Sequence, residues 1–374
     1  MASPTVRLAI IANVMTPYRL HLLRRIQNEL PDVELHTILT HRTPNQPWEM
    51  EWADLRVERI PVHDQGRNSL VSQIRAVRTI RAYLENHHID HAIINGYNDL
   101  TRIVLLRRLP KSGSAVFLRG DSNLASNATK PKWRRRFKRP FLRWLTNRCA
   151  GIFYMGVLGR QYYQHYGHPD VPLFDMPYDI DLDQFRYAPP SSETTDRVAI
   201  FVGRLAPEKA VVDLVQQFVQ LSPDFPAWRL RVIGDGPLAE RIDALVVEGE
   251  GRVDRVGFVD HSRLPRVYES ADFLVLPSHT EPWGVVATEA MASGLAVIAT
   301  DVVGAASELA EYGPKVVHRI APGRDALGRA LRIAMSEDWR RSQSARSAVE
   351  SWHEAKDPVR ALGLALGLSP RRVS

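Results

Sequence analysis

Short apolar runs alternate with longer segments of helical spacing along most of the chain. In the first half, apolar-rich runs predict buried strands at Leu8–Ala12, Val33–Leu39, Ala92–Ile94 and Ala115–Leu118. Between them, Ser69–Asn86 has its apolar residues at the spacing of a helix face. Strands alternating with helices in this way are typical of a parallel sheet that is covered by helices.

The second half begins the same pattern anew. The predicted strands are Val198–Val202, Leu230–Ile233, Val253–Val256, Phe273–Leu276 and Ala296–Ala299, and the predicted helices are Lys209–Gln220, Leu238–Glu248 and Val285–Ala292. Each half therefore reads as a doubly wound α/β unit of the Rossmann type. Ligands of such sheets bind beyond the carboxyl ends of the strands, so we expect two domains facing a cleft.

A stretch without apolar rhythm separates the halves. Residues 186–196 are rich in Pro, Ser and Thr and are interpreted as a linker. The prediction is a first domain over residues 1–185 and a second over 197–350, which suits a chain of 374 residues. Residues 351–374 are expected to form a helix that packs back on the first domain.

Composition narrows the class of protein. Hydrophobic residues make up 44% and charged residues 24%, the balance of a globular protein. Cys149 is the single cysteine, so an intramolecular disulfide is excluded. No apolar run approaches the roughly 20 residues of a transmembrane helix, and Val6–Ala12 is better explained as a buried strand than as a signal peptide.

The most informative polar cluster runs from Glu281 to Glu289. It follows a predicted buried strand, with Glu281 in a loop and Glu289 about one turn inside the next helix. The first backbone N–H groups of a helix lack helical partners and attract anions, and Gly284 leaves room for close approach. Carboxylates beside such a site suit the binding of hydroxyl groups. Alternatively, the acidic residue in the first turn of the helix only interacts favourably with the helix dipole, and Glu289 is exposed.

Three further segments follow predicted strands. Arg204 and Lys209 flank a tight turn, Gly234 belongs to a Gly-Asp-Gly-Pro turn that lets backbone approach a ligand, and Phe258 belongs to a Gly-Phe-Val segment. Each is weak evidence alone, since a lone Arg and Lys are commonly just solvated. Their order, and their place at the ends of strands, make a phosphate site the better interpretation.

In this order, the four segments resemble glycosyltransferase family 4, retaining enzymes of the GT-B fold. The matching motifs are Gly-Arg-x4-Lys, Gly-Asp-Gly-Pro, Gly-Phe-Val and Glu-x7-Glu, within about 198–309. The resemblance implies a fold of two Rossmann-like domains and the transfer of a hexose from a UDP- or GDP-linked donor. It also implies roles for individual residues: Arg204 and Lys209 neutralise the diphosphate, Glu281 lies beside the transferred sugar, Glu289 holds the ribose, Phe258 lies at the base, and Gly203, Gly234, Gly284 and Val285 contact the donor.

The first half resembles the family less closely. The glycine-rich turn of better-known members is absent after the first strand, where Pro-Tyr-Arg stands instead. Together with Arg-Gly-Asp after a later strand, this looks like a subgroup that acts on exopolysaccharide or cell-surface glycans. The resemblance implies that Tyr18, Arg19, Arg119 and Asp121 lie at the cleft and contact a glycan or lipid-linked acceptor. For Arg119, a structural ion pair is an equally good explanation.

No metal or other cofactor is implied, because protein cations and a helix terminus would take the place of a divalent ion. Asp179-x-Asp181 and Asp181-x-Asp183 are formal Asp-x-Asp matches, but we expect them to cap turns. The rival functions are a nucleotide-sugar epimerase of the same fold and a basic nucleic-acid-binding protein. No aromatic motif for stacking single strands supports the latter, so no nucleic-acid partner is predicted.

Positive charge is concentrated in residues 130–148. The chain carries a net charge of +7, and this segment holds nine Lys or Arg residues and no acidic one. Its aromatic residues recur on one helical face, at Trp133, Phe137, Phe141 and Trp144, with Pro140 expected to break or restart the helix. The pattern predicts a helix lying on an anionic membrane surface, which fits a cytoplasmic enzyme peripheral to the inner face. Equally, the aromatic side chains could pack on the sheet.

Overall fold

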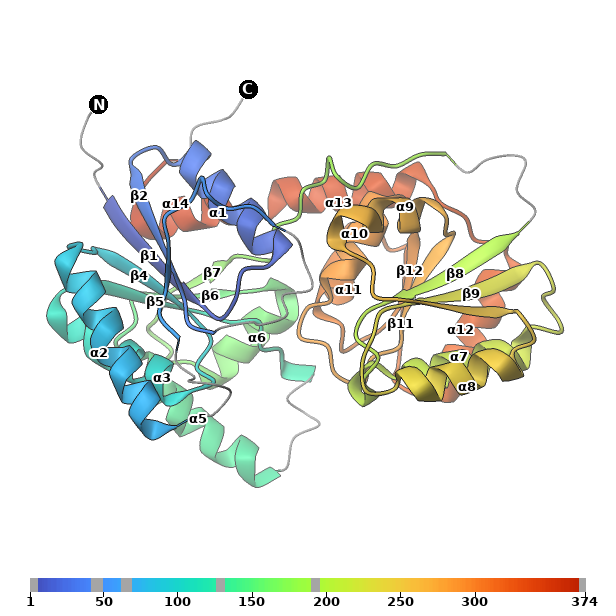
Figure 1. Ribbon diagram of the computed structural model, residues 1–374, viewed down its shortest axis with the longest axis horizontal. Helices are drawn as coiled ribbons and strands as arrows, with labels where there is room; N and C mark the ends of the chain where they lie inside the picture. Colours follow the sequence, from blue (N-terminus) through green and yellow to red (C-terminus); the bar gives the residue numbers. More distant parts are fainter. Residues whose placement is uncertain (1–5, 42–49, 62–68, 126–131, 190–195, 370–374) are drawn as a thin grey trace. The chain divides into compact units, whose positions relative to one another are not determined.

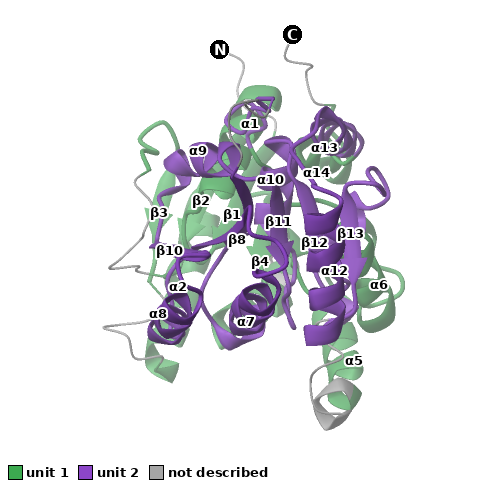
Figure 2. Cartoon of the chain, turned by 90° about the vertical axis from the view of Figure 1, so that its right-hand side faces the viewer, with its two compact units in different colours: residues 1–122, 130–180, 356–374 green, residues 123–129, 181–355 purple. Residues whose placement is uncertain are grey.

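The computed structural model describes residues 6–41, 50–61, 69–125, 132–189 and 196–369 (Figure 1). The chain divides into two compact units, coloured separately in Figure 2. Unit 1 comprises residues 1–122, 130–180 and 356–374, and unit 2 comprises residues 123–129 and 181–355. The chain therefore passes from unit 1 to unit 2 and returns to unit 1 for its last helix.

Unit 1 is built on a parallel sheet of strand order β3-β2-β1-β4-β5-β6-β7. Its strands are β1 (Val6–Ala12), β2 (Val33–Leu39), β3 (Val57–Arg59), β4 (His91–Asn95), β5 (Ala115–Arg119), β6 (Gly151–Tyr154) and β7 (Leu173–Asp175). Its helices are α1 (Pro17–Glu29), α2 (Leu70–Asn86), α3 (Leu100–Arg108), the 3₁₀ turn η1 (Leu109–Ser112), α5 (Lys132–Thr146), α6 (Gly156–Tyr166) and α14 (Pro358–Leu366). Strand order reverses between β1 and β4, which is where a ligand site is expected.

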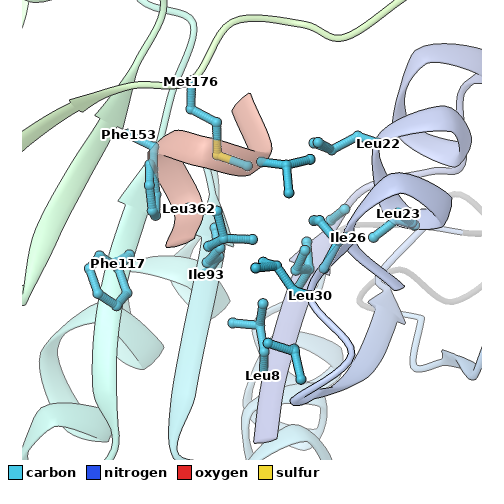
Figure 3. Close-up of a cluster of buried hydrophobic side chains, with 14 of the residues drawn as sticks. Leu8, Leu22, Leu23, Ile26, Leu30, Ile93, Phe117, Phe153, Met176 and Leu362 are labelled. Atoms are coloured by element: carbon cyan, nitrogen blue, oxygen red, sulfur yellow. The ribbon is translucent and has the colours of Figure 1, made fainter. Parts of the chain in front are cut away.

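The core of unit 1 lies between this sheet and the pair of helices α1 and α14 (Figure 3). Alternate residues of a strand point to the same face, so Leu8, Ile93 and Phe117 from three adjacent strands form one apolar surface. Ile26 of α1 and Leu362 of α14 cover it, and all five side chains are 4% exposed or less. The C-terminal helix is thus an integral part of this core.

Ion pairs hold α14 to the rest of unit 1. The Arg25 guanidinium on α1 contacts Glu29 at 2.6 Å, Asp179 at 3.1 Å and Asp357 at 2.6 Å, and Asp357 also caps the start of α14. These three carboxylates raise the pKa of Arg25 further above its ordinary value against the opposing effect of burial. Asp179 therefore takes part in an ion pair. Asp181 accepts the N–H groups of Asp183 and Gln184, as expected for a residue that caps a turn.

Unit 2 contains a second parallel sheet, of strand order β10-β9-β8-β11-β12-β13. Its strands are β8 (Arg197–Val202), β9 (Trp228–Ile233), β10 (Val253–Gly257), β11 (Phe273–Leu276), β12 (Ala296–Thr300) and β13 (Val317–Ile320). Its helices are η2 (Pro207–Lys209), α7 (Val211–Leu221), α8 (Ala239–Glu248), η3 (His261–Arg263), α9 (Leu264–Glu269), α10 (Val285–Ala292), α11 (Gly304–Leu309), α12 (Arg324–Ser336) and α13 (Gln343–Ala355). Here strand order reverses between β8 and β11.

The prediction of α/β units with parallel sheets is confirmed. One local prediction is wrong: α5 runs without interruption from Lys132 to Thr146 although it contains Pro140. Proline in a helix leaves the carbonyl of the residue four positions earlier without its N–H partner. Here that residue is Arg136, and both it and Pro140 are exposed. Water can satisfy the carbonyl at this position, so the helix continues.

Candidate functional site

The loops that follow β8, β9 and β10 are joined through their backbones at one edge of the unit 2 sheet. The Gly203 N–H donates to Ile233 O at 3.0 Å, the Leu205 N–H to Asp235 O at 2.9 Å, and the Gly234 N–H to Gly257 O at 2.7 Å. A Cβ on Gly234 would lie 1.9 Å from the Gly203 carbonyl oxygen. Gly234 therefore permits two backbone segments to meet, and its contact with a donor stays a prediction.

Lys209 and Glu281 form an ion pair where strand order reverses. Lys209 ends η2, and the carbonyl of the neighbouring Glu208 accepts the His279 N–H at 2.8 Å, which joins the loop after β8 to the loop after β11. The Lys209 Nζ donates to the Glu281 carboxylate, and Glu281 is only 9% exposed. Two loops from different strands thus place a cation and a carboxylate in contact.

Gly284 lies directly against this ion pair. It precedes α10 with a φ of 88°, in the left-handed region that favours glycine. A Cβ at this position would lie 3.2 Å from Glu281 Cγ and 3.0 Å from Val303 Cγ1. The Ala287 N–H of its first turn donates to the Gly284 carbonyl at 3.0 Å. Among the described residues no side chain caps the start of α10, which leaves the N–H groups of Val285 and Val286 for a ligand. Lys209, Glu281 and Gly284 therefore lie together, with a helix N-terminus beside them.

Glu289 is buried, so the alternative that leaves it exposed is wrong. It is 2% exposed, on α10, and the Tyr268 hydroxyl donates to its Oε2 at 2.9 Å. His261 Nε2 lies 3.2 Å from Oε1. A carboxylate accepts about four hydrogen bonds, so Glu289 keeps capacity for further donors such as ligand hydroxyls. Burial beside Glu289 raises the pKa of Tyr268 well above its usual value.

The remaining residues predicted for this site lie at the surface of unit 2. Arg204 is exposed on the loop between β8 and η2, and Val285 is half-buried in the first turn of α10. Phe258 is 49% exposed just after β10. Among the interactions between described residues, none joins Arg204 to the ion pair of Lys209 and Glu281.

In unit 1, three of the four residues predicted at the acceptor site line one pocket of about 110 Å³. These are Arg19, Arg119 and Asp121, and Tyr178 lines the same pocket. Tyr18 does not line the pocket, but the centroid of its ring lies 4.4 Å from that of the Tyr178 ring, which does. Whether an acceptor binds there stays a prediction.

In the part of the chain that the structure describes, Arg119 forms no structural ion pair of the kind that the sequence allowed. Its Nη2 donates to the carbonyls of Met176 and Pro177 at 3.4 and 3.3 Å, and its guanidinium lies 5.5 Å from the Tyr178 ring. Burial lowers the pKa of Arg119 from its ordinary value. The Asp121 carboxylate accepts the Tyr178 hydroxyl at 3.1 Å.

Sequence reasoning missed several residues that shape these sites. Asn123, in unit 2, donates to the carbonyls of Glu281, Pro282 and Val302 at 3.0 to 3.1 Å and so holds the loop that carries Glu281. Tyr268 and His261 were missed as partners of Glu289. Asn is common in loops and Tyr in cores, and no spacing links these positions in the sequence to the residues that they contact.

Two aromatic residues of the basic helix α5 are exposed. Phe137 is 67% exposed and Trp144 is 48% exposed, whereas Leu142 and Leu145 are buried. Packing of the aromatic side chains on the sheet is therefore wrong for Phe137 and Trp144, while Phe141 is half-buried. The side chain of Trp133 lies outside the described residues. Within the described part of the chain, no helix is long and apolar enough to cross a membrane.

Within the same described ranges, no three His, Cys, Asp or Glu side chains gather as ligands for a metal ion. Cys149 is buried, and burial raises the pKa of its thiol to about 12. A thiol with that pKa is protonated at neutral pH and is a poor nucleophile.

A family model matches the part of the chain that carries the Lys209 and Glu281 site. Residues 184–350 match the model of the family Glycosyl transferases group 1. Over 185 residues the chain is 35% identical to D-inositol 3-phosphate glycosyltransferase of Nocardia farcinica, covering 41% of each protein. Over 126 residues it is 34% identical to an exopolysaccharide phosphotransferase of Streptomyces coelicolor, covering 33% of this chain and 13% of that protein. The chain matches less than half the length of these relatives.

Solved glycosyltransferase structures resemble both units. Sucrose-phosphate synthase from Thermosynechococcus elongatus superposes with a TM-score of 0.72 at 19% identity, over 97% of both chains. HepE from Anabaena, in complex with UDP, superposes with a TM-score of 0.71 at 16% identity, over 97% of this chain and 99% of that one. The group 1 glycosyltransferase region is thus part of a chain with the GT-B fold.

Proposed function

We propose that the protein is a retaining hexosyltransferase of glycosyltransferase family 4. It would move a hexose from a UDP- or GDP-linked donor to a glycan or lipid-linked acceptor in cell-surface polysaccharide synthesis. The observation that carries this proposal is the contact of Lys209, Glu281 and Gly284 where strand order reverses in unit 2. The family match over residues 184–350 and the UDP complex of the similar HepE structure support it.

The site suits a leaving diphosphate. The cations Arg204 and Lys209, together with the free N–H groups at the start of α10, would stabilise the negative charge that develops on the leaving oxygen. Glu281 holds Lys209 in place, so little reorganisation is needed during the reaction. Protein groups would thus supply the charge stabilisation without a metal ion or other cofactor.

The proposed step is a substitution on one face of the sugar. The bond between the anomeric carbon and the phosphate oxygen breaks, and the acceptor hydroxyl oxygen bonds to that carbon from the same side. The hydroxyl proton passes to the leaving phosphate oxygen. Glu281 would contact the transferred sugar, and its ion pair with Lys209 makes it a weaker covalent nucleophile. Glu289, supported by Tyr268, would bind the ribose.

Lys209→Ala tests this role. With UDP- and GDP-hexoses and a glycan or lipid-linked acceptor, we expect kcat to fall by roughly 10²-fold or more, because Lys209 acts on charge that develops in the transition state. Lys315→Ala, at an exposed position of the same unit, is the control. A change confined to KM would contradict the catalytic role, and conversion of the nucleotide sugar without any acceptor would instead identify an epimerase.

The exposed face of α5 is proposed to contact anionic lipid at the inner face of the membrane. Phe137 and Trp144 are exposed on a helix that lies within a segment of nine basic residues and no acidic ones. Aromatic rings enter the interface while basic side chains meet anionic head groups. We expect sedimentation with liposomes that contain anionic lipid, weaker binding for Phe137→Ser, and unchanged binding for Val247→Ser, whose side chain is 80% exposed in unit 2. Equal sedimentation with neutral and anionic liposomes would refute the idea.

A further inference from the structure

The pocket in unit 1 lies where ligands of a doubly wound sheet are expected to bind. Its lining includes Asn13, which follows β1, Asn95 at the end of β4, and Arg119 at the end of β5. Strand order reverses between β1 and β4, so the carboxyl ends of these strands diverge there and leave space. The position alone therefore marks the pocket as a ligand site.

Among the described residues, two arginines of this pocket form no ion pair within contact distance of a carboxylate. Arg119 is 5% exposed, and its Nη2 donates to two carbonyl oxygens. Its Nε has no hydrogen-bond partner in the described part of the chain. The Nη1 of Arg19 donates to the Val14 carbonyl, and its buried Nε likewise has no partner. A buried charge is costly when it is neither paired nor fully hydrogen-bonded. These two guanidinium groups can therefore donate further hydrogen bonds to an anion.

Another buried arginine of unit 1, Arg102, shows which partners a guanidinium with a structural role has. Arg102 is 1% exposed, pairs with the Asp99 carboxylate and donates to Asn13 Oδ1 and to Thr40 Oγ1. Its Nε, like that of Arg119, has no hydrogen-bond partner among the described residues, so the two arginines differ in the partners of their terminal nitrogens. Arg119 has no such set of partners. Asp121, which lines the same pocket, accepts the Tyr178 hydroxyl.

A third donor without a partner lines the same pocket. The Nδ2 of Asn95 is buried and makes no hydrogen bond to any described residue. Three donors from three different side chains suit three oxygen atoms, which a phosphoryl group presents and a carboxylate does not. The pocket volume of about 110 Å³ is well below the roughly 300 Å³ of a typical ligand site, so it suits one such group and not a whole nucleotide.

We propose that this pocket binds a phosphoryl group of the acceptor, held by Arg119, Arg19 and Asn95. Calling the ligand an acceptor rests on the proposed transferase function, whereas binding of the phosphoryl group does not. The acceptor class is then a phosphorylated sugar or a lipid-linked phosphate, which present the same group to these three side chains.

Binding of inorganic phosphate to the full chain tests the proposal. The parent carries Arg204→Ala and Lys209→Ala, so that the expected phosphate site of unit 2 does not contribute. Thermal unfolding at increasing phosphate concentration then gives the dissociation constant. We expect Arg119→Gln to weaken phosphate binding roughly tenfold or more, and Arg108→Gln, at an exposed position of unit 1, to leave it unchanged. Equal dissociation constants for these two variants would overturn the proposal.

Two further variants keep the test decisive if Arg119→Gln does not fold. Arg119→Lys keeps the charge but loses the planar pair of donors, so phosphate should bind more weakly than to the parent. Asp121→Asn removes a negative charge from the pocket lining, so phosphate should bind more tightly. Unchanged phosphate binding in both variants would exclude the pocket as the site.

A last comparison distinguishes the two sources of the phosphoryl group. Glucose 6-phosphate and a short-chain prenyl phosphate are titrated against the same parent and against Arg119→Gln. The probe whose binding depends on Arg119 identifies the source, and no dependence for either probe would overturn an acceptor phosphate. Because no nucleotide sugar is present, these results do not depend on whether the protein transfers a sugar.

Discussion

Gly234→Ala is expected to separate the loops that form the edge of the unit 2 sheet. The new methyl carbon would lie 1.9 Å from the Gly203 oxygen, whereas ordinary contact begins at 3.4 Å, so the backbones must move apart. That movement breaks up to three hydrogen bonds, from the N–H groups of Gly203, Gly234 and Leu205. At about 1 kcal/mol each, with about 1 kcal/mol more for alanine at a φ of 136°, the loss in free energy of unfolding is about 4 kcal/mol.

The control is Gly251→Ala, in the same unit. Gly251 has a φ of 76° and no atom within 4 Å of the added carbon, so only the backbone cost of about 1 kcal/mol applies. At roughly 2–4 °C for each kcal/mol, Gly234→Ala should lower the Tm by roughly 8–16 °C and Gly251→Ala by roughly 2–4 °C. Calorimetry measures both, and hydrogen exchange of the β9 peptides localises the effect. Equal Tm values for the two variants would refute the reasoning.

Three other predictions concern the core, the pH dependence and Glu289. Leu362→Ala removes a fully buried side chain from the core of unit 1 and should cost about 2–5 kcal/mol of unfolding free energy, measured by urea denaturation. Burial lowers the pKa of His36, so the unfolded chain binds more protons below about pH 6.5 and stability should fall as the pH drops from 7 to 5.5. His36→Gln should flatten that slope and His88→Gln, at an exposed position, should not; equal slopes would contradict the assignment. Tyr268→Phe removes a donor to the buried Glu289 and should weaken UDP binding several-fold by calorimetry, and an unchanged affinity would exclude Glu289 from the donor site.

The apolar pattern predicted the second unit well where strands are buried on both faces. This holds for β8, β11 and β12, which form continuous apolar runs bounded by polar turns. The predicted ranges of β11 and α10 agree with the structure, and β8, β9 and β10 differ by at most two residues at an end. The short edge strand β3 was not predicted, since its three residues are partly exposed and carry no continuous apolar run. The persistence of α5 through Pro140 depends on solvent exposure, which the sequence pattern does not report.

The sequence predicted those residues of the candidate sites that follow adjacent strands of a sheet. Lys209 and Glu281 follow β8 and β11, which are adjacent in the sheet, so a parallel fold brings them to the same edge. The partners of Glu289 lie on η3 and α9, in a connection whose path depends on tertiary packing. Likewise, the sequence could not show which side chain the Asp121 carboxylate contacts. Asp121 is two residues from Arg119 in the sequence, but its carboxylate accepts the hydroxyl of Tyr178.

The return of the chain to unit 1 has a consequence for synthesis on the ribosome. Domains usually complete their folding in the order in which they are translated. Here Val359 and Leu362 belong to the core of unit 1, although most of that unit precedes unit 2 in the sequence. Unit 2 can finish folding first, while the unit 1 sheet, already packed against α1, keeps the part of its apolar face that α14 covers exposed until that helix emerges. In the interval, that face is available to chaperones and to other nascent chains.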